Sequence, residues 1–230
     1  GETPRMAPVA LADAARPESG HGGDAYADSF RERMSEFAAR AFISGLFVVL
    51  ATRIGAEFLQ TGHLTGLLLL VSELLVVVLT VVRRRAAVVD RTWQARVVAA
   101  ASIVLVPLIK PTGGGLVADA WTAALSGVGL LVIIAGKVTL GRSFGLMPAH
   151  RGLVSGGIYG FVRHPIYLGY LVTHIAFVVA HPSPWNLTLL FISDASLLLR
   201  AVYEERTLAR DPEYVSYMER VRWRVAPGVF

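Results

Sequence analysis

The sequence predicts an all-α protein, a polytopic integral membrane bundle of about six transmembrane helices. Hydrophobic residues make up 54% of the 230-residue chain and charged residues only 17%, whereas a typical soluble domain has roughly 25% charged residues. The apolar residues are clustered, and the run 64–82 contains a single charge, Glu73. Because a helix of that length crosses a hydrocarbon core about 30 Å thick, a membrane location follows.

Cysteine content and net charge exclude several classes of function. The chain has no cysteine, which rules out disulfides, thiolate metal sites and a cysteine nucleophile. Its net charge of +5 is compatible with nucleic-acid binding. In a membrane protein, however, an excess of arginine is typical of the cytoplasmic face and its anionic lipids. We therefore expect membrane lipids as partners, and no nucleic acid.

The first part of the chain is polar. Residues 1–28 are rich in Ala, Gly, Pro and Asp without periodicity, which predicts a disordered segment. Ser29 and Glu32 then form a capping-box pattern before a helical face of apolar residues. Two interpretations are open: a short helix lying on the membrane surface, or the polar end of the first span. In either case residues 29–136 form an N-terminal membrane region.

Apolar segments separated by polar turns predict the spans. The third is short and contains Pro107, so its helix either tilts little in the membrane or starts earlier, near Trp93. Asp211 is a good N-cap and Pro212 suits the first helical position, which predicts an amphipathic tail helix. A loop, two spans and this tail make up a C-terminal region, residues 137–230. The predicted spans are residues 41–59, 64–82, 97–109, 116–136, 165–180 and 185–203.

The distribution of basic residues predicts the topology. If the N-terminus is cytoplasmic, all of the 22 Lys and Arg residues except Arg53 and Lys110 fall on the cytoplasmic side. This is a strong positive-inside signal. We therefore expect both termini in the cytoplasm, with the protein in a bacterial inner membrane. The polar stretch 141–170 and the pair Glu204-Glu205 then lie on the same side and can form one site.

Common catalytic motifs are missing. There is no G-x-G-x-x-G between a strand and a helix, no Walker A lysine and no H-E-x-x-H. Clustered metal-ligand spacing and a serine-hydrolase elbow are also absent, so we expect no metal site.

The remaining candidate is a glycine-rich cytoplasmic loop with polar side chains. Arg163 and His164 precede Pro165, which suits the first turn of a helix. A helix N-terminus with these side chains favours a bound carboxylate or phosphate. Arg200 and Glu204 are four residues apart, so they share one helical face.

Several short motifs carry a resemblance to a known family. They are Leu140-Gly141-Arg142-Ser143-Phe144, His150-Arg151-Gly152-Leu153-Val154, Gly157-Ile158-Tyr159, Arg163-His164-Pro165-x-Tyr167-Leu168-Gly169 and Glu204-Glu205-x-x-Leu208. The set resembles the isoprenylcysteine carboxyl methyltransferase family and the related bacterial phospholipid methyltransferases. The resemblance covers about residues 137–225.

The resemblance implies S-adenosyl-L-methionine as methyl donor, bound at the cytoplasmic face without a Rossmann fold. Glu204 or Glu205 would hold the polar groups of this cofactor. Arg163 and Arg200 are candidates to orient an anionic substrate group, and Glu204 or His164 could assist an acceptor that must lose a proton. The residues that would line the cofactor pocket are His150, Leu153, Val154, Gly157, Tyr159, His164, Tyr167 and Leu168.

The acceptor is expected to be lipophilic or lipidated. A carboxylate on an isoprenylcysteine-like or other isoprenoid molecule is the first candidate, and a phospholipid head group is the second. Membrane sterol reductases that use NADPH have a similar Arg-His-Pro stretch. In their pattern Asn follows the Pro and an acid follows the Gly, whereas this chain has Ile166 and Tyr170 there. A non-catalytic scaffold is the third interpretation.

Some polar residues within the spans have no assigned role. Glu73 and Asp194 are either functional groups or partners in a contact that locks the bundle, and His174 is more typical of a packed bundle residue than of a ligand. The first two spans have no other assigned role, which makes them candidates for contacts in a homo-oligomer.

Overall fold

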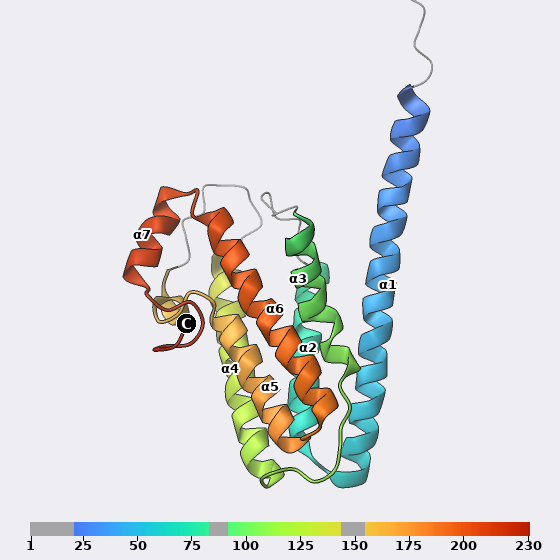
Figure 1. Ribbon diagram of the computed structural model, residues 1–230, viewed down its shortest axis with the longest axis vertical. Coiled ribbons are helices and arrows are strands. Elements are labelled where there is room, and N and C mark those ends of the chain that lie inside the picture. The colour runs from blue at the N-terminus through green and yellow to red at the C-terminus, as the bar shows by residue number, and fades with distance from the viewer. Residues whose placement is uncertain (1–20, 83–91, 144–154) are drawn as a thin grey trace, which may run out of the picture. The chain divides into compact units, whose positions relative to one another are not determined.

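The computed structural model describes residues 21–82, 92–143 and 155–230, and its regular elements in these ranges are all helices (Figure 1). The chain divides into two units, residues 1–42 and 43–230, and α1 continues through the boundary between them. The α-helices are α1 (His21–Thr61), α2 (Leu64–Val82), α3 (Trp93–Val104), α4 (Asp119–Ser143), α5 (Pro165–Ala180), α6 (Pro184–Leu208) and α7 (Pro212–Arg220), with 3-10 helices η1 (Val106–Leu108) and η2 (Gly157–Gly160).

Most predicted helices are confirmed. The bounds of α2 and α5 coincide with the predicted spans, and α3 starts at Trp93 and gives way to η1, which contains Pro107. The predicted cap of the tail helix is also confirmed, because the Asp211 side chain accepts a hydrogen bond from the Glu213 N–H at 2.9 Å.

Two predicted boundaries are wrong. The sequence places residues 21–28 in a disordered segment, but α1 is continuous from His21 to Thr61. Of the two interpretations of the segment that starts at Ser29, the continuous helix favours the polar end of the first span. Extending an existing helix is much easier than nucleating a new one, so the span propagates into the polar region. For the same reason α4 continues to Ser143, beyond the predicted end at residue 136, and the predicted loop starts later. Residues 1–20 lie outside the described residues.

The closest helix packing is between α4 and α5. Gly129 of α4 lies directly against Gly169 of α5: a Cβ built on Gly169 would be 2.7 Å from the Gly129 carbonyl oxygen. Small residues allow helix backbones to approach closely within a membrane. This contact fixes the position of α5, which begins at the polar stretch singled out in the sequence.

The other helices complete the bundle. The helix α2 packs against α4 and α5, and α3 packs against α6. A hydrophobic core joins α1, α2, η1, α5 and α6, and Leu50, Ile54 and Phe177 are fully buried within it. In Figure 1 the helix α7 lies near the start of α5 and the end of α6, at one end of this bundle.

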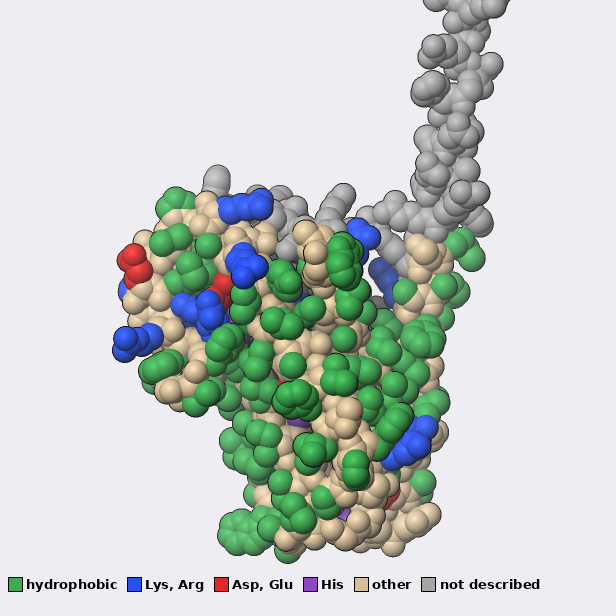
Figure 2. All heavy atoms as spheres, in the orientation of Figure 1, with side chains coloured by type: hydrophobic (Ala, Val, Ile, Leu, Met, Phe, Trp, Pro, Cys, Tyr) green, Lys and Arg blue, Asp and Glu red, His purple; other side chains and the backbone are tan. Residues whose placement is uncertain are grey.

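The surface of the bundle is apolar. Large hydrophobic side chains such as Leu131 (66% exposed) and Phe191 (72% exposed) face outward. Figure 2 shows hydrophobic side chains over much of the visible face, with Lys and Arg gathered mainly at the end that carries α7. An apolar surface of this extent is typical of contact with lipid rather than water.

Three helices of the described residues are long and apolar enough to cross a membrane: Phe37–Thr61, Asp119–Leu140 and Pro184–Leu208. Three more predicted spans correspond to shorter apolar helices, Leu64–Leu75, Trp93–Leu108 and Pro165–Ala180. The structure therefore supports an all-helical membrane protein, and six spans stay a prediction.

Candidate functional site

The start of α5 is held by the C-terminal tail of the chain. The backbone N–H groups of Arg163 and His164 donate to the carbonyl oxygens of Trp223 and Arg224, at 2.9 and 2.7 Å. Pro165 follows at the first helical position, where its missing N–H is not needed. The tail therefore fixes the backbone of the Arg-His-Pro stretch directly.

Glu205 of α6 is the centre of a buried ion-pair network. Only 4% of the surface of Glu205 is exposed, and Arg163 Nε lies 2.8 Å from its Oε1. Arg224 Nε donates to its Oε2 at 2.7 Å, and His164 Nε2 lies 3.1 Å from its Oε1. The negative charge of a carboxylate buried among such partners is balanced by their positive charges. Removing one partner leaves an unbalanced buried charge. Glu205 thus ties α5, α6 and the tail together.

The Arg163 side chain makes its contacts within this network. Its guanidinium also donates to the carbonyl oxygens of Met218 and Val221, at 3.4 and 3.3 Å, and its side chain is only 8% exposed. An arginine with so many of its N–H groups bound by the protein has few donors left for a ligand. We therefore regard Arg163 as a positioning residue, although the sequence makes it a candidate for contact with an anionic substrate.

Glu204 is next in the chain but faces different groups. Its Oε1 accepts hydrogen bonds from the Tyr167 hydroxyl at 2.9 Å and from Arg200 Nε at 3.0 Å. Its Oε2 lies 3.9 Å from His164 Nδ1, and the side chain is 40% exposed. Glu204 and Arg200, whose side chain is 32% exposed, are therefore charged groups that a bound molecule could reach, and so is Arg224, whose side chain is 36% exposed.

Aromatic rings form one wall of this region. The His164 and Tyr167 rings are stacked with their centroids 5.2 Å apart. The Arg200 guanidinium lies 6.0 Å from the centroid of the Tyr167 ring. Stacked rings of this kind can take a planar base or a cation against a face.

The tail helix α7 contacts η2 and Arg163. Tyr214, Tyr217 and Val221 form a small core, and the Tyr217 hydroxyl donates to the Tyr159 carbonyl oxygen at 2.8 Å. Burial raises the pKa of the Tyr217 phenol to about 12, with the nearby Glu205 carboxylate also raising it. Tyr217 is therefore a neutral donor at pH 7, and it holds η2 against α7.

The structure brings together most of the predicted site residues that it describes. His164, Tyr167, Glu204, Glu205, Arg163 and Arg200 form one connected network. Tyr159 is buried nearby, and Gly157 has φ 59°, a conformation that favours glycine. Leu168 is half-buried on α5 without a polar contact to the network. His150, Leu153 and Val154 lie outside the described residues.

Arg224 is a residue that sequence reasoning missed. Among the described residues that contact Glu205 it makes the shortest ion pair, yet it stands 19 positions further along the chain. Its sequence neighbourhood, arginines around Trp223, indicates only an interfacial tail. No local pattern specifies which carboxylate such an arginine contacts.

A second polar cluster lies inside the bundle. His174 Nδ1 is 2.5 Å from Asp194 Oδ1, and its Nε2 is 3.3 Å from Glu73 Oε1. The His174 side chain is 4% exposed and joins α2, α5 and α6. Of the alternatives left open by the sequence, this geometry favours a contact that locks the bundle, with His174 as the partner of both acids.

One comparison with known proteins identifies a related family. The sequence model of a family described as phospholipid methyltransferase matches residues 119–214. This stretch begins with α4 and includes η2, α5, α6 and the first residues of α7. None of the curated proteins matches the chain at a significant level. The matched region contains Arg163, His164, Tyr167 and both glutamates of the network, but Arg224 lies beyond it.

Proposed function

We propose that this protein, whose residues 119–214 belong to the phospholipid methyltransferase family, is an integral membrane methyltransferase that uses S-adenosyl-L-methionine and acts on a lipophilic acceptor. The observation that carries the proposal is the coincidence of the family match with one polar network. That network lies at one end of the apolar helices α5 and α6.

The chemistry of the exposed groups fits the proposed cofactor. S-adenosyl-L-methionine has an ammonium and ribose hydroxyls that need acceptors, a carboxylate that needs a donor, and a planar adenine. Glu204 provides partly free carboxylate oxygens, and Arg200 provides guanidinium N–H groups on the same face. The stacked rings of His164 and Tyr167 provide an aromatic surface.

When bound, the cofactor supplies a methyl group on a positively charged sulfur. The residues of the chain act by positioning. Glu205 holds Arg163, His164 and Arg224 in fixed orientations, and Tyr167 and Arg200 fix the Glu204 carboxylate. Holding two reactants in line can lower a barrier by roughly 7–11 kcal/mol in favourable cases. The described side chains of the network suit this role.

A carboxylate acceptor, as on an isoprenylcysteine-like molecule, is the first candidate. Three arginines and one histidine surround two glutamates here, so the described network has at least one surplus positive charge. A surplus of this sign favours an anionic group. A carboxylate also needs no general base, because it attacks in its ionised form.

A phospholipid amine is the second candidate, and the description of the matched family favours it. An ammonium must lose a proton before it can accept a methyl group. Glu204 and His164 are the described groups that could take this proton, since His164 Nδ1 lies 3.9 Å from Glu204 Oε2.

Cofactor binding is the first test. Calorimetry on protein in nanodiscs should detect S-adenosyl-L-methionine and S-adenosylhomocysteine at micromolar affinity, and no NADPH. Glu204→Gln should weaken binding about tenfold or more, the loss of a charge-assisted hydrogen bond. Glu213→Gln, an exposed acid on α7, is the matched control. Binding of NADPH alone would favour a reductase, and binding of neither would favour a scaffold.

Transfer of a labelled methyl group then separates the two acceptors. Farnesylcysteine derivatives and phosphatidylethanolamine would be supplied in parallel. A methyl ester releases methanol in mild base, whereas an N-methyl group does not. Base-labile product supports the carboxylate, and base-stable lipid product supports the amine.

A further inference from the structure

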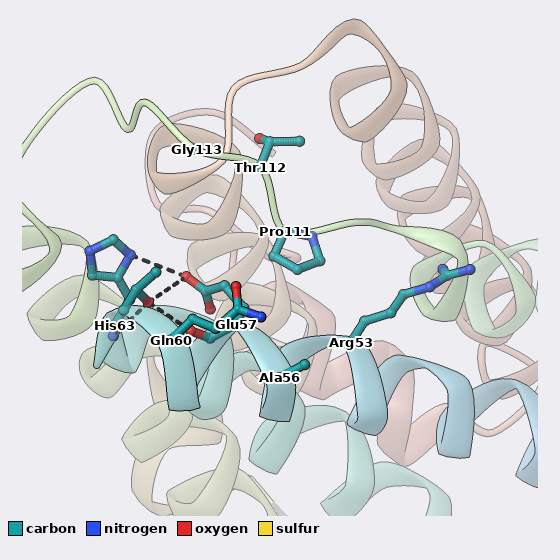
Figure 3. A pocket seen from close by; sticks show the side chains of 9 residues that line it. Arg53, Ala56, Glu57, Gln60, His63, Pro111, Thr112 and Gly113 are labelled. Carbon is teal, nitrogen blue, oxygen red and sulfur yellow. Dashed lines mark hydrogen bonds and ion pairs between the residues drawn. The ribbon is translucent and has the colours of Figure 1, made fainter.

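A hollow lies at the opposite end of the bundle from the Glu204–Glu205 network. It is formed by the last turns of α1, by His63 and by the segment Pro111–Gly113, and its volume is about 330 Å³. Figure 3 shows Arg53 and Glu57 on the same side of α1 as that segment, with the Arg53 side chain extending away from Glu57 and with His63 beside Glu57. A second hollow of about 210 Å³ shares His63 and Thr112 with it. Sites for small molecules start at about this size.

Glu57 lacks a full set of donors. Its Oε1 accepts from the Thr61 hydroxyl and lies near His63 Nδ1, both at 3.1 Å. Its Oε2 is buried and has no hydrogen-bond partner among the described residues. An unpaired buried oxygen is costly. Oε2 lies on the side of Gly66, where a Cβ would be 3.5 Å from it. Because the terminal torsion of a glutamate is soft, rotation of the carboxylate can bring either oxygen to a donor in the hollow.

Arg53 is one helical turn from Glu57, but the two side chains do not pair. Arg53 donates instead to the Ile109 carbonyl oxygen at 3.4 Å, and no carboxylate of the described residues lies within 4.0 Å of it. The sequence would suggest a pair at this spacing. The hollow is thus lined by a cation and an anion that each lack a partner of full opposite charge.

The position of the hollow indicates where its ligand comes from. It lies where α1 ends and α2 begins, and the neighbouring Leu59 and Leu116 side chains are 86% and 70% exposed. Lys110 lies over the ring of Trp185 at 5.2 Å, an arrangement typical of a membrane interface. A molecule in the hollow can therefore extend apolar chains along the outside of the bundle.

From these observations we propose a lipid site in the hollow, which holds the phosphoethanolamine head group of an aminophospholipid. Arg53 binds the phosphate and Glu57 binds the ammonium. A phosphate suits the planar guanidinium, and an ammonium supplies the donors that the Glu57 carboxylate lacks. The site is distinct from the Glu204–Glu205 network, which lies at the other end of α5 and α6.

Native mass spectrometry on the detergent-purified protein tests the proposal. The wild type should retain one more phosphatidylethanolamine molecule than Glu57→Gln or Arg53→Gln. Each substitution should weaken the binding of this one lipid roughly tenfold. Phosphatidylglycerol, which has the phosphate but no ammonium, should bind weakly at this site. Ala56→Phe, which fills the hollow without changing a charge, should also abolish the binding of phosphatidylethanolamine there. The thermal midpoint of each variant, compared with the wild type, identifies any variant that has lost its fold.

Two controls isolate the site. Thr52→Ala changes an exposed residue of α1 outside the hollow and should bind like the wild type. Glu204→Gln should leave this binding unchanged, because it alters only the other end of the bundle. The proposal is overturned if the folded variants retain as much phosphatidylethanolamine as the wild type, or if phosphatidylglycerol binds equally. If the protein binds soluble phosphoethanolamine but not intact phosphatidylethanolamine, the ligand of the hollow is not a membrane lipid, and the proposal is also overturned.

Discussion

Glu204 and Glu205 are adjacent in the chain but have different surroundings. Glu205 points into the protein, where Arg163, His164 and Arg224 surround it. Glu204 is 40% exposed and is held by Tyr167 and Arg200. On a helix, consecutive side chains are about 100° apart, so two neighbours can face the interior and the solvent. This division agrees with a structural role for Glu205 and with the proposed ligand-binding role of Glu204.

The Glu73–His174–Asp194 cluster is the other residue-level feature. Ionisable groups within a membrane are costly unless they are paired. Here one imidazole lies between two carboxylates, on three different helices. Removing one partner of such a cluster is costly, whereas replacing the whole cluster by apolar groups of similar volume can leave the fold equally stable.

Removing only His174 should therefore be more harmful than removing the whole cluster. We expect His174→Leu to lower the free energy of unfolding by about 3–5 kcal/mol, because it leaves two unpaired acids in the bundle. The triple variant with Glu73→Met and Asp194→Leu should recover most of this loss. Thermal or denaturant unfolding in detergent measures both. Equal stability of the single and triple variants would contradict a paired cluster.

At the scale of elements, the α4–α5 contact positions the site. The start of α5 carries Arg163-His164-Pro165, and the approach of Gly169 to Gly129 determines where this helix lies on α4. The tail adds a second constraint, because Trp223 and Arg224 bind the backbone just before α5. Both contacts join segments that are far apart in the sequence.

Gly169→Ala tests the close approach. The added methyl would lie 2.5 Å from Ile133 Cγ1 and 2.7 Å from the Gly129 oxygen, so α4 and α5 must separate. We expect a loss of roughly 1–3 kcal/mol in unfolding free energy. The matched control is Gly127→Ala on the partner helix α4, where a Cβ meets nothing within 4 Å. It should be neutral or slightly stabilising, since Ala favours helix. The same loss in both variants would exclude a steric cause.

At the scale of the whole molecule, basic residues lie at both ends of the bundle. Arg163, Arg200 and Arg224 lie at the α7 end, whereas Arg53 and Lys110 lie near the hollow at the other end. This distribution agrees with the positive-inside pattern read from the sequence. If the predicted orientation is correct, the proposed methyltransferase site lies at the cytoplasmic face and the proposed lipid site at the opposite face.

The absence of cysteine from the chain allows a clean test of topology. Single cysteines would be introduced as Ser216→Cys on α7 and Gly113→Cys beside the hollow, both at exposed positions. In intact cells a membrane-impermeant maleimide should label Gly113→Cys and leave Ser216→Cys unlabelled, and permeabilised cells should show both. Labelling of Ser216→Cys in intact cells would reverse the predicted orientation.

The sequence by itself determined which segments are helical. Apolar run length and the placement of proline located α2 and α5 to the residue, and Asp211 with Pro212 located α7. It also selected Arg163, His164, Tyr167, Glu204 and Glu205, which the structure joins in one network, while their roles in methyl transfer stay predictions. Helix formation, capping and short motifs depend on residues that are close together in the sequence, which is why local patterns reveal them.

Only the tertiary structure decided which side chains are partners. The spacing of Arg53 and Glu57 along one helix allows an ion pair, but Arg53 donates to the carbonyl oxygen of Ile109 instead. The sequence gives no sign that Arg224 binds Glu205 or that His174 joins two acids. Helical periodicity tells which residues share a face, but not which other helix that face meets. The partner of a buried charge depends on how the helices pack, because desolvation makes each charge pair with whatever group that packing brings close.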